Sequence, residues 1–254
     1  MVEKDYIIKE KKILPSGCAL LELQTADGSA MPVCQPGQFV EVAVNAAGVM
    51  LRRPISICNC DGTLMTLFVK PVGNGSRALV NLEPGAVINL VGPLGHGFTL
   101  ASRGERTLLV GGGVGAAPLV MLSHALDTNG VDIEVVLGGR SATDIAGIPA
   151  LYRARQVSLS TDDGTVGEQG LVTQNTSFAK EFDRIYCCGP TPMMRAVAEI
   201  ARERGIWCEV SLENMMACGL GACLCCVQEA DDHHNVCVCT EGPVFNINRL
   251  TTWR

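Results

Sequence analysis

ENMMACGLGACLCCVQEADDHHNVCVCTEGPVF, the stretch from Glu213 to Phe245, decides how this chain of 254 residues is organised, because it holds six of the thirteen cysteines. Cys218, Cys223 and Cys226 follow the spacing C-x4-C-x2-C, and glycines stand at positions 219 and 221. This spacing is typical of plant-type [2Fe-2S] centres, in which cysteine thiolates bind the iron. The glycines allow backbone N–H groups to turn toward the sulfurs and stabilise the reduced cluster. The stretch therefore predicts an electron-transfer centre, with Cys237 or Cys239 as the fourth ligand.

Composition and charge exclude several classes of protein. With 47% hydrophobic and 18% charged residues, the chain is globular rather than disordered. Its net charge of -6, without a dense run of Lys or Arg, disfavours nucleic acid as a partner. The first residues, MVEKDYIIKEKK, are charged where a signal peptide is apolar, and the longest apolar run is too short to cross a membrane. We therefore expect a cytoplasmic protein that makes no contact with a membrane.

The remaining cysteines and the histidines of the cysteine-rich stretch are expected to be structural. Cytoplasmic thiols stay reduced, so a disulfide framework is not expected. The two histidines at positions 233 and 234 are predicted at a solvated loop tip rather than at a second metal site. We expect five scattered cysteines to be buried and to pack as small hydrophobic residues, namely Cys18, Cys34, Cys58, Cys60 and Cys208.

The chain divides into three regions with different patterns. Residues 1–101 contain six short apolar segments separated by turns, which predicts an antiparallel β-barrel with a short helix at 76–82. In residues 102–206, apolar strands alternate with helices, which predicts a parallel sheet; one of these helices is expected at 148–155. Residues 207–254 form a small cysteine-rich domain that we expect to fold around its metal.

Two glycine-rich turns are placed to bind phosphate groups. GNGS at 73–76 and GGGVGAA at 111–117 each open a helix, whose first N–H groups and positive dipole end suit a pyrophosphate. The second turn lies at a strand-to-helix junction, where open α/β sheets bind ligands. Arg53 can pair with a phosphate through its planar fork, and Ser56 can hydrogen-bond a ring nitrogen. Cys188 begins a CGP turn at the same edge of the sheet, and without a neighbouring base it is not expected to be a nucleophile.

Taken together, the motifs resemble those of a known family over essentially the whole chain. They are, in order, RRPISI, GNGS, GPLGHGF, LLVGGGVGAAPL, YCCGPTPMM, SLENMMACGLGACLCC and CTEGPVF. The chain is similar to the electron-transfer subunits of NAD-linked class 1B dihydroorotate dehydrogenase, within the ferredoxin reductase superfamily. The resemblance implies FAD between barrel and sheet, NAD on the parallel sheet, and a [2Fe-2S] cluster in the C-terminal domain.

The resemblance also implies which residues form each site. Flavin contacts fall on three segments, namely Arg53, Pro54, Ile55 and Ser56, then Phe68, Val69 and Lys70, then Gly75 and Ser76. The nucleotide-side turns comprise Gly111, Gly112, Gly113 and Gly115, followed by Cys188, Gly189 and Pro190. The family pattern places the fourth cluster ligand three residues before the glycine of GPVF, which selects Cys239. Cys218 and Cys223 would then bind one iron, and Cys226 and Cys239 the other.

The implied function is electron transfer between a pyridine nucleotide and the FMN of a dihydroorotate dehydrogenase catalytic subunit in pyrimidine biosynthesis. The resemblance implies a heterotetramer of two chains of each kind, with the dihydroorotate site on the partner. Asp162 and Asp163 would disfavour the 2'-phosphate of NADP, whereas Arg140 would favour it, and we prefer NAD.

Two alternatives fit the same residues. One is a subunit of an NADPH-linked ferredoxin oxidoreductase or sulfide dehydrogenase, which would share the layout. The other is a zinc-stabilised interaction module without enzymatic activity, because cysteine groups also bind zinc.

Overall fold

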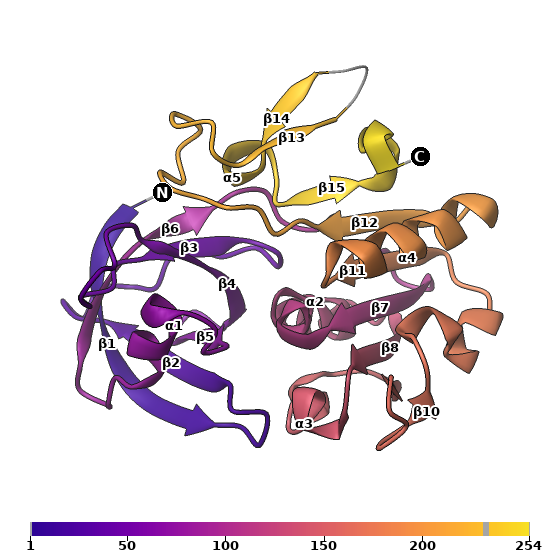
Figure 1. Cartoon of the computed structure of the whole chain (residues 1–254), viewed down its shortest axis with the longest axis horizontal. Coiled ribbons are helices and arrows are strands. Elements are labelled where there is room, and N and C mark those ends of the chain that lie inside the picture. The colour runs from indigo at the N-terminus through magenta and orange to yellow at the C-terminus, as the bar shows by residue number, and fades with distance from the viewer. Residues whose placement is uncertain (1, 231–233, 254) are drawn as a thin grey trace.

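A computed structural model describes residues 2–230 and 234–253 and places a β-barrel beside a parallel sheet, with the C-terminal segment lying across one side of both (Figure 1). This architecture confirms the fold class that the sequence predicts. Of the two histidines expected at a loop tip, the one at position 234 is exposed, and the one at 233 lies outside the described residues.

Six strands close the antiparallel barrel in the order β1-β2-β5-β4-β3-β6. Alternate side chains along β6 are buried, as expected for strands with one face on a core. The expected short helix is present as α1, between β5 and β6. The bounds are β1 (Val2–Ile13), β2 (Ala19–Thr25), β3 (Phe39–Val42), β4 (Arg53–Cys60), β5 (Met65–Val69), α1 (Asn74–Val80) and β6 (Val87–Leu94).

A seven-stranded sheet forms the second half, in the order β10-β9-β8-β7-β11-β12-β15. All neighbours are parallel except the pair β12 and β15. Strand β7 is the first strand of this sheet in chain order, and its neighbours β8 and β11 lie on opposite sides, so the carboxyl ends of β7 and β11 form a topological switch point. The bounds are β7 (Arg106–Gly112), β8 (Asp132–Gly139), β9 (Gln156–Thr161), β10 (Glu168–Gln169), β11 (Arg184–Cys188), β12 (Trp207–Ser211) and β15 (Val244–Asn246).

Four helices accompany the sheet and the C-terminal segment, α2 (Ala117–Thr128), α3 (Ala142–Ile145), α4 (Thr191–Glu203) and α5 (Val238–Glu241). The prediction of a helix at 148–155 is wrong, because within this range only Pro149–Leu151 is helical, as a 3-10 turn. The backbone of Tyr152 is extended, and its hydroxyl donates to the carbonyl of Ala116 at 2.7 Å. This contact with the start of α2 fixes the segment in a non-helical path. No helix within the described residues is long and apolar enough to cross a membrane.

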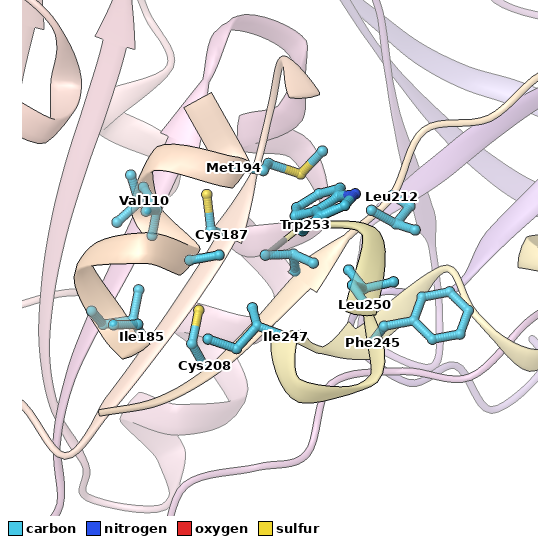
Figure 2. Close-up of a cluster of buried hydrophobic side chains, with 14 of the residues drawn as sticks. Val110, Ile185, Cys187, Met194, Cys208, Leu212, Phe245, Ile247, Leu250 and Trp253 are labelled. Carbon is cyan, nitrogen blue, oxygen red and sulfur yellow. The ribbon is translucent and has the colours of Figure 1, made fainter. Parts of the chain in front are cut away.

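The C-terminal region is anchored to the sheet. Strands β12 and β15 both lie in the predicted region 207–254, yet they extend the seven-stranded sheet. The hairpin β13 (Val227–Glu229) and β14 (Asn235–Cys237) projects beyond them. Phe245, Leu250 and Trp253 pack into one buried cluster with Met194 of α4 (Figure 2). This shared core fastens the cysteine-rich segment to the sheet, and the predicted boundaries between the three regions stay predictions.

The scattered cysteines divide into two groups. Cys18, Cys58 and Cys208 are no more than 2% exposed, which confirms them as buried residues. Cys34 and Cys60 are only partly buried, so the expectation is wrong for these two.

Candidate functional site

A cavity of about 370 Å³ lies where the barrel meets the sheet, within the size range of ligand sites. The barrel contributes all four residues of the predicted Arg53 to Ser56 segment, together with Phe68, Lys70, Gly75 and Ser76. Val69 points instead into the barrel core, where it is 1% exposed. The sheet contributes Gly115 and Cys188. The structure therefore brings two separately predicted groups of residues to one cavity.

The GNGS turn is shaped around the Arg53 side chain. A Cβ added to Gly75 would lie 2.6 Å from Arg53 Nε, so only glycine leaves room for the guanidinium. Ser76 Oγ accepts the backbone N–H groups of Val72 at 2.9 Å and of Gly73 at 3.1 Å, which holds the turn closed. The Arg53 cation consequently lies at the cavity wall, where it suits an anionic group such as a pyrophosphate.

A second cavity, of about 400 Å³, opens at the carboxyl ends of the parallel strands. Gly112, Gly113 and Pro190 line it, as predicted residues of the nucleotide side. Of the residues described, Lys70 is the one that lines both cavities. The two cavities are therefore adjacent, which suits two ligands that exchange electrons.

Close backbone packing explains the glycines at the switch point. A Cβ on Gly115 would lie 2.6 Å from the backbone carbon and oxygen of Cys188. A Cβ on Gly111 would lie 2.9 Å from the Leu137 side chain, and one on Gly112 would lie 2.7 Å from Met193 Sδ. Gly111 thus packs against the Leu137 side chain and lines neither cavity. Burial raises the pKa of the Cys188 thiol to about 12, which keeps it neutral and agrees with a role other than nucleophile.

Besides Lys70, three charged residues line the second cavity. Arg140, Asp144 and Asp162 all line it. Arg140 donates to both carboxylate oxygens of Asp144, at 2.9 and 3.2 Å, so its charge is already paired. Asp163 accepts from the backbone and hydroxyl of Thr165 and belongs to its own turn.

The cysteine-rich loop brings its four predicted ligands together as two pairs. In each pair the backbone N–H of the second cysteine donates to the sulfur of the first, Cys223 to Cys218 and Cys239 to Cys226, both at 3.4 Å. Within residues 2–230 and 234–253, no group of three His, Cys, Asp or Glu side chains could hold a single metal ion. Two thiol pairs fit two irons bridged by sulfide, whereas a structural zinc requires four ligands around one ion.

Backbone N–H groups point toward these sulfurs. Cys218 Sγ accepts from Leu220 at 3.3 Å and from Cys223 at 3.4 Å, which lowers the pKa of its thiol to about 6. Gly221 donates to Cys239 Sγ at 3.2 Å. Positive φ angles at Gly219, Gly221 and Leu224 curl the loop so that these donors face inward. The loop therefore has both the thiolates and the inward N–H groups that a [2Fe-2S] cluster needs.

Cys237 and Cys239 differ in their surroundings. Cys239 is 1% exposed, and its backbone N–H donates to Cys226 Sγ at 3.4 Å. The Cys237 sulfur is instead directed at the carbonyl of Gly221, at 3.9 Å.

A buried carboxyl lies beneath the cysteine loop. Glu41, on β3, is 1% exposed, and neither of its carboxyl oxygens has a hydrogen-bond partner within the described residues. Burial raises its pKa to about 7; Arg52 opposes this rise and Cys218 reinforces it. A Cβ on Gly219 would lie 3.0 Å from Glu41 Cγ, so the cysteine loop rests directly on this residue.

Sequence reasoning missed several residues of the flavin-side cavity. Phe39, Glu213, Asn214 and Met216 line it. The last three follow β12 directly, and an acidic residue just past the carboxyl end of a buried strand is the signal that could have found Glu213. The same segment continues into the cysteine loop, so it forms a wall of one site and the approach to the other.

The barrel, the parallel sheet with its glycine turns and the paired thiols define a flavin- and pyridine-nucleotide-linked iron-sulfur reductase of the ferredoxin reductase type. Residues 213–251 match the iron-sulfur cluster binding domain of dihydroorotate dehydrogenase B. The electron transfer subunit of dihydroorotate dehydrogenase B (NAD(+)) from Shouchella clausii is 40% identical over 225 residues, covering 85% of this chain and 86% of that one. Its counterpart from Bacillus cereus strain B4264 is 35% identical and covers 96% of both chains. The chain belongs to the family of dihydroorotate dehydrogenase B electron transfer subunits.

Solved structures share the fold. The NADH-dependent reduced ferredoxin-NADP oxidoreductase, studied for flavin-based electron bifurcation, matches with a TM-score of 0.82 and 28% identity over 98% of this chain and 94% of that one. Phthalate dioxygenase reductase matches with a TM-score of 0.65 and 20% identity over 94% of both chains. The family and these structures confirm the resemblance that the sequence motifs indicate.

Proposed function

We propose that this chain passes electrons between NAD(H) and the catalytic subunit of a dihydroorotate dehydrogenase. The observation that carries the proposal is the contiguity of three sites. Lys70 lines both the nucleotide-side and the flavin-side cavities, and the segment from Leu212 to Met216 lines the flavin-side cavity and then leads to Cys218. A carrier that must move electrons over short distances needs its centres in such a row.

The cofactor set predicted from the sequence, FAD, a [2Fe-2S] cluster and NAD, is confirmed by the family and the fold. FAD, when bound, converts between the two-electron chemistry of nicotinamide and the one-electron chemistry of iron-sulfur centres. Arg53 would bind its pyrophosphate, and the Ser56 hydroxyl would hydrogen-bond its ring. Neutral Cys188 and the Gly115 backbone would form the wall between flavin and nucleotide.

The ligands that we propose for the cluster are Cys218, Cys223, Cys226 and Cys239. The thiol pairs and the N–H group that Gly221 directs at Cys239 support this set. Cys239→Ser should abolish the normal cluster spectrum and lower the bound iron, whereas the matched variant Cys237→Ser should retain both. The reverse outcome would reassign the fourth ligand to Cys237.

An electron transfer subunit implies a catalytic partner subunit. We propose that the partner carries FMN and the dihydroorotate site, and that two chains of each kind form a heterotetramer. The side chains of Met215, Leu220 and Leu224 are 80, 49 and 62% exposed around the cysteine loop, which suits a surface that a partner covers. Light scattering of the reconstituted complex tests the stoichiometry; a mass equal to one chain of each kind would contradict it.

NAD is the nucleotide that we propose. The Asp162 carboxylate at the cavity rim would repel an added 2'-phosphate, and the Arg140 charge that could attract one is already paired with Asp144. The names of the relatives, which specify NAD(+), agree with this preference.

The test of the function is reconstitution with a dihydroorotate dehydrogenase catalytic subunit. We expect orotate-dependent oxidation of NADH that requires both chains. Activity with NADPH and ferredoxin, and none with orotate, would favour the alternative oxidoreductase instead, whose fold is represented by the ferredoxin-NADP oxidoreductase above. The cytoplasmic location stays a prediction.

A further inference from the structure

Two cysteines of the barrel, Cys34 and Cys60, lie close together outside the sites described above. The thiols lie near enough for each to shift the pKa of the other. Both thiols also lie beside the carbonyl oxygen of Pro32, at 3.5 Å from Cys34 Sγ and 3.6 Å from Cys60 Sγ. Cys34 belongs to the connector between β2 and β3, and Cys60 is the last residue of β4. The fold thus brings two thiols from separate segments to one point.

Solvent access separates this pair from the other cysteines outside the cysteine-rich loop. Cys34 and Cys60 are partly exposed, whereas the remaining cysteines in the barrel and the sheet are buried. The pair also lies away from the flavin-side cavity, since neither residue lines it. The pair is therefore more accessible than the other cysteines of the barrel and sheet, although both residues also pack against the barrel core.

The two thiols have opposite acid-base character. The hydrogen bond from Cys34, aided by the backbone N–H of Gly62, lowers the pKa of Cys60 to about 7, against burial and the charge of Asp61. The same hydrogen bond, with burial, raises the pKa of Cys34. On β1, burial and the charges of Cys34, Cys60 and Asp27 raise the pKa of the Tyr6 phenol. Near neutral pH the pair therefore combines a thiolate with a neutral thiol that donates to it.

We propose that Cys34 and Cys60 form a reversible intramolecular disulfide by exchange with small-molecule disulfides such as glutathione disulfide. The Cys60 thiolate is the attacking group and Cys34 is the resolving group.

The exchange balances in two steps. Cys60 sulfur bonds to one sulfur of glutathione disulfide, the S–S bond of that molecule breaks, and one glutathione leaves as a thiolate with the electron pair. Cys34 then loses its proton to solvent and attacks Cys60 Sγ, and the second glutathione leaves as a thiolate. The protein dithiol is oxidised by two electrons, and glutathione disulfide is reduced to two thiols.

The geometry favours a disulfide over a metal site. A disulfide needs the sulfurs to approach to about 2.05 Å, and both sulfurs already lie beside the same carbonyl oxygen, that of Pro32. Residues 28–35 of the connector belong to no strand or helix, so Cys34 can move without breaking the barrel ladder. A metal would lack a third ligand, because no group of three donors that could hold one is found in the described parts of the chain.

The test uses the full chain loaded with FAD and cluster. The protein is incubated with glutathione disulfide at pH 7, its free thiols are alkylated, and it is digested without reduction for mass spectrometry. We expect peptides cross-linked through Cys34 and Cys60, which separate again after treatment with reduced glutathione. Cys58→Ser, which changes a buried cysteine of the same strand, should leave the cross-link unchanged.

Single substitutions separate the two roles. Cys34→Ser should trap one glutathione on Cys60 as a stable mixed disulfide, whereas Cys60→Ser should leave Cys34 unmodified. Glutathione attached to Cys34 in the Cys60→Ser variant, at a rate matching that on Cys60, would overturn the assignment of roles.

The rate of alkylation of Cys60 by iodoacetamide gives an independent readout. At pH 7, a cysteine with a pKa of about 7 has about 16 times more thiolate than one with an ordinary pKa of about 8.5. A less basic thiolate is also less nucleophilic, which lowers the alkylation rate about fivefold. The expected net effect is about threefold faster alkylation, with a midpoint near pH 7 that moves upward in Cys34→Ser. Absence of the cross-link would overturn the proposal. It would also be overturned if added zinc protected both thiols from alkylation while glutathione disulfide exchanged with neither.

Discussion

Replacing Glu41 by glutamine should change how the stability of the protein depends on pH. This carboxyl is 1% exposed and unpartnered within the described residues, and burial raises its pKa to about 7 from an ordinary value of 4.5. A pKa difference of about 2.5 corresponds to about 3 kcal/mol, at 1.36 kcal/mol for each pH unit. The pKa of Glu41 is higher in the folded protein than in the unfolded chain. Below about pH 4.5 the carboxyl is protonated in both states, and burial has no electrostatic cost. As the pH rises from about 4.5 through 7, the unfolded chain ionises more readily than the folded protein, and the stability of the folded protein falls. The amide of Glu41→Gln cannot ionise and escapes this loss.

The assay compares the wild-type protein and Glu41→Gln in urea at pH 5 and pH 8, at matched flavin and iron content, since bound cofactors complicate two-state analysis. We expect the unfolding free energy of the variant, relative to wild type, to increase by about 2 to 3 kcal/mol between the two pH values. Glu10→Gln, at an exposed position of β1, controls for the lost charge. If the unfolding free energy of the variant relative to wild type stays constant between the two pH values, or falls, the buried carboxyl does not control this pH dependence.

Three further substitutions test the cavities. Gly75→Ala should displace the Arg53 guanidinium, whose Nε would lie 2.6 Å from the new Cβ, and should weaken flavin retention about tenfold, as measured by fluorescence of released flavin; retention equal to that of wild type would contradict this. Asp162→Ala should raise the use of NADPH relative to NADH about fivefold in a dye-reduction assay, since one repulsion of about 1 kcal/mol is removed, and an unchanged ratio would contradict this. Gly115→Ala should cost about 1 to 3 kcal/mol and lower the thermal midpoint, because its Cβ would press on the Cys188 backbone; a midpoint equal to that of wild type would count against the tight packing.

Local patterns in the sequence predict most of the fold. The alternating strands of the barrel and the buried strands of the sheet follow from short-range hydrophobic periodicity, and the GNGS and GGGVG turns follow from glycine at junctions. Pairing between distant segments is different, because no local signal records it. The attachment of β15 to β12 and the packing of Trp253 against Met194 depend on contacts between residues far apart in the chain.

The candidate site shows the same division. The cysteine spacing identifies Cys218, Cys223 and Cys226 because these ligands are close in sequence. The burial of Glu41 beneath Gly219 could not be predicted, since a charged residue within a short strand is ordinarily expected at the surface. The proximity of Cys34 and Cys60 was missed for a related reason. Each looks like an isolated small residue until the barrel closes.

The proposed function requires the chain to conduct electrons from NADH to its cluster. The most direct measurement is an anaerobic titration of the purified, cofactor-loaded chain with NADH, followed by visible absorption and electron paramagnetic resonance. We expect loss of the oxidised flavin bands together with a reduced [2Fe-2S] signal, which Cys239→Ser should lack and Cys237→Ser should keep. Flavin reduction by NADH without any cluster signal in the wild-type chain would contradict it.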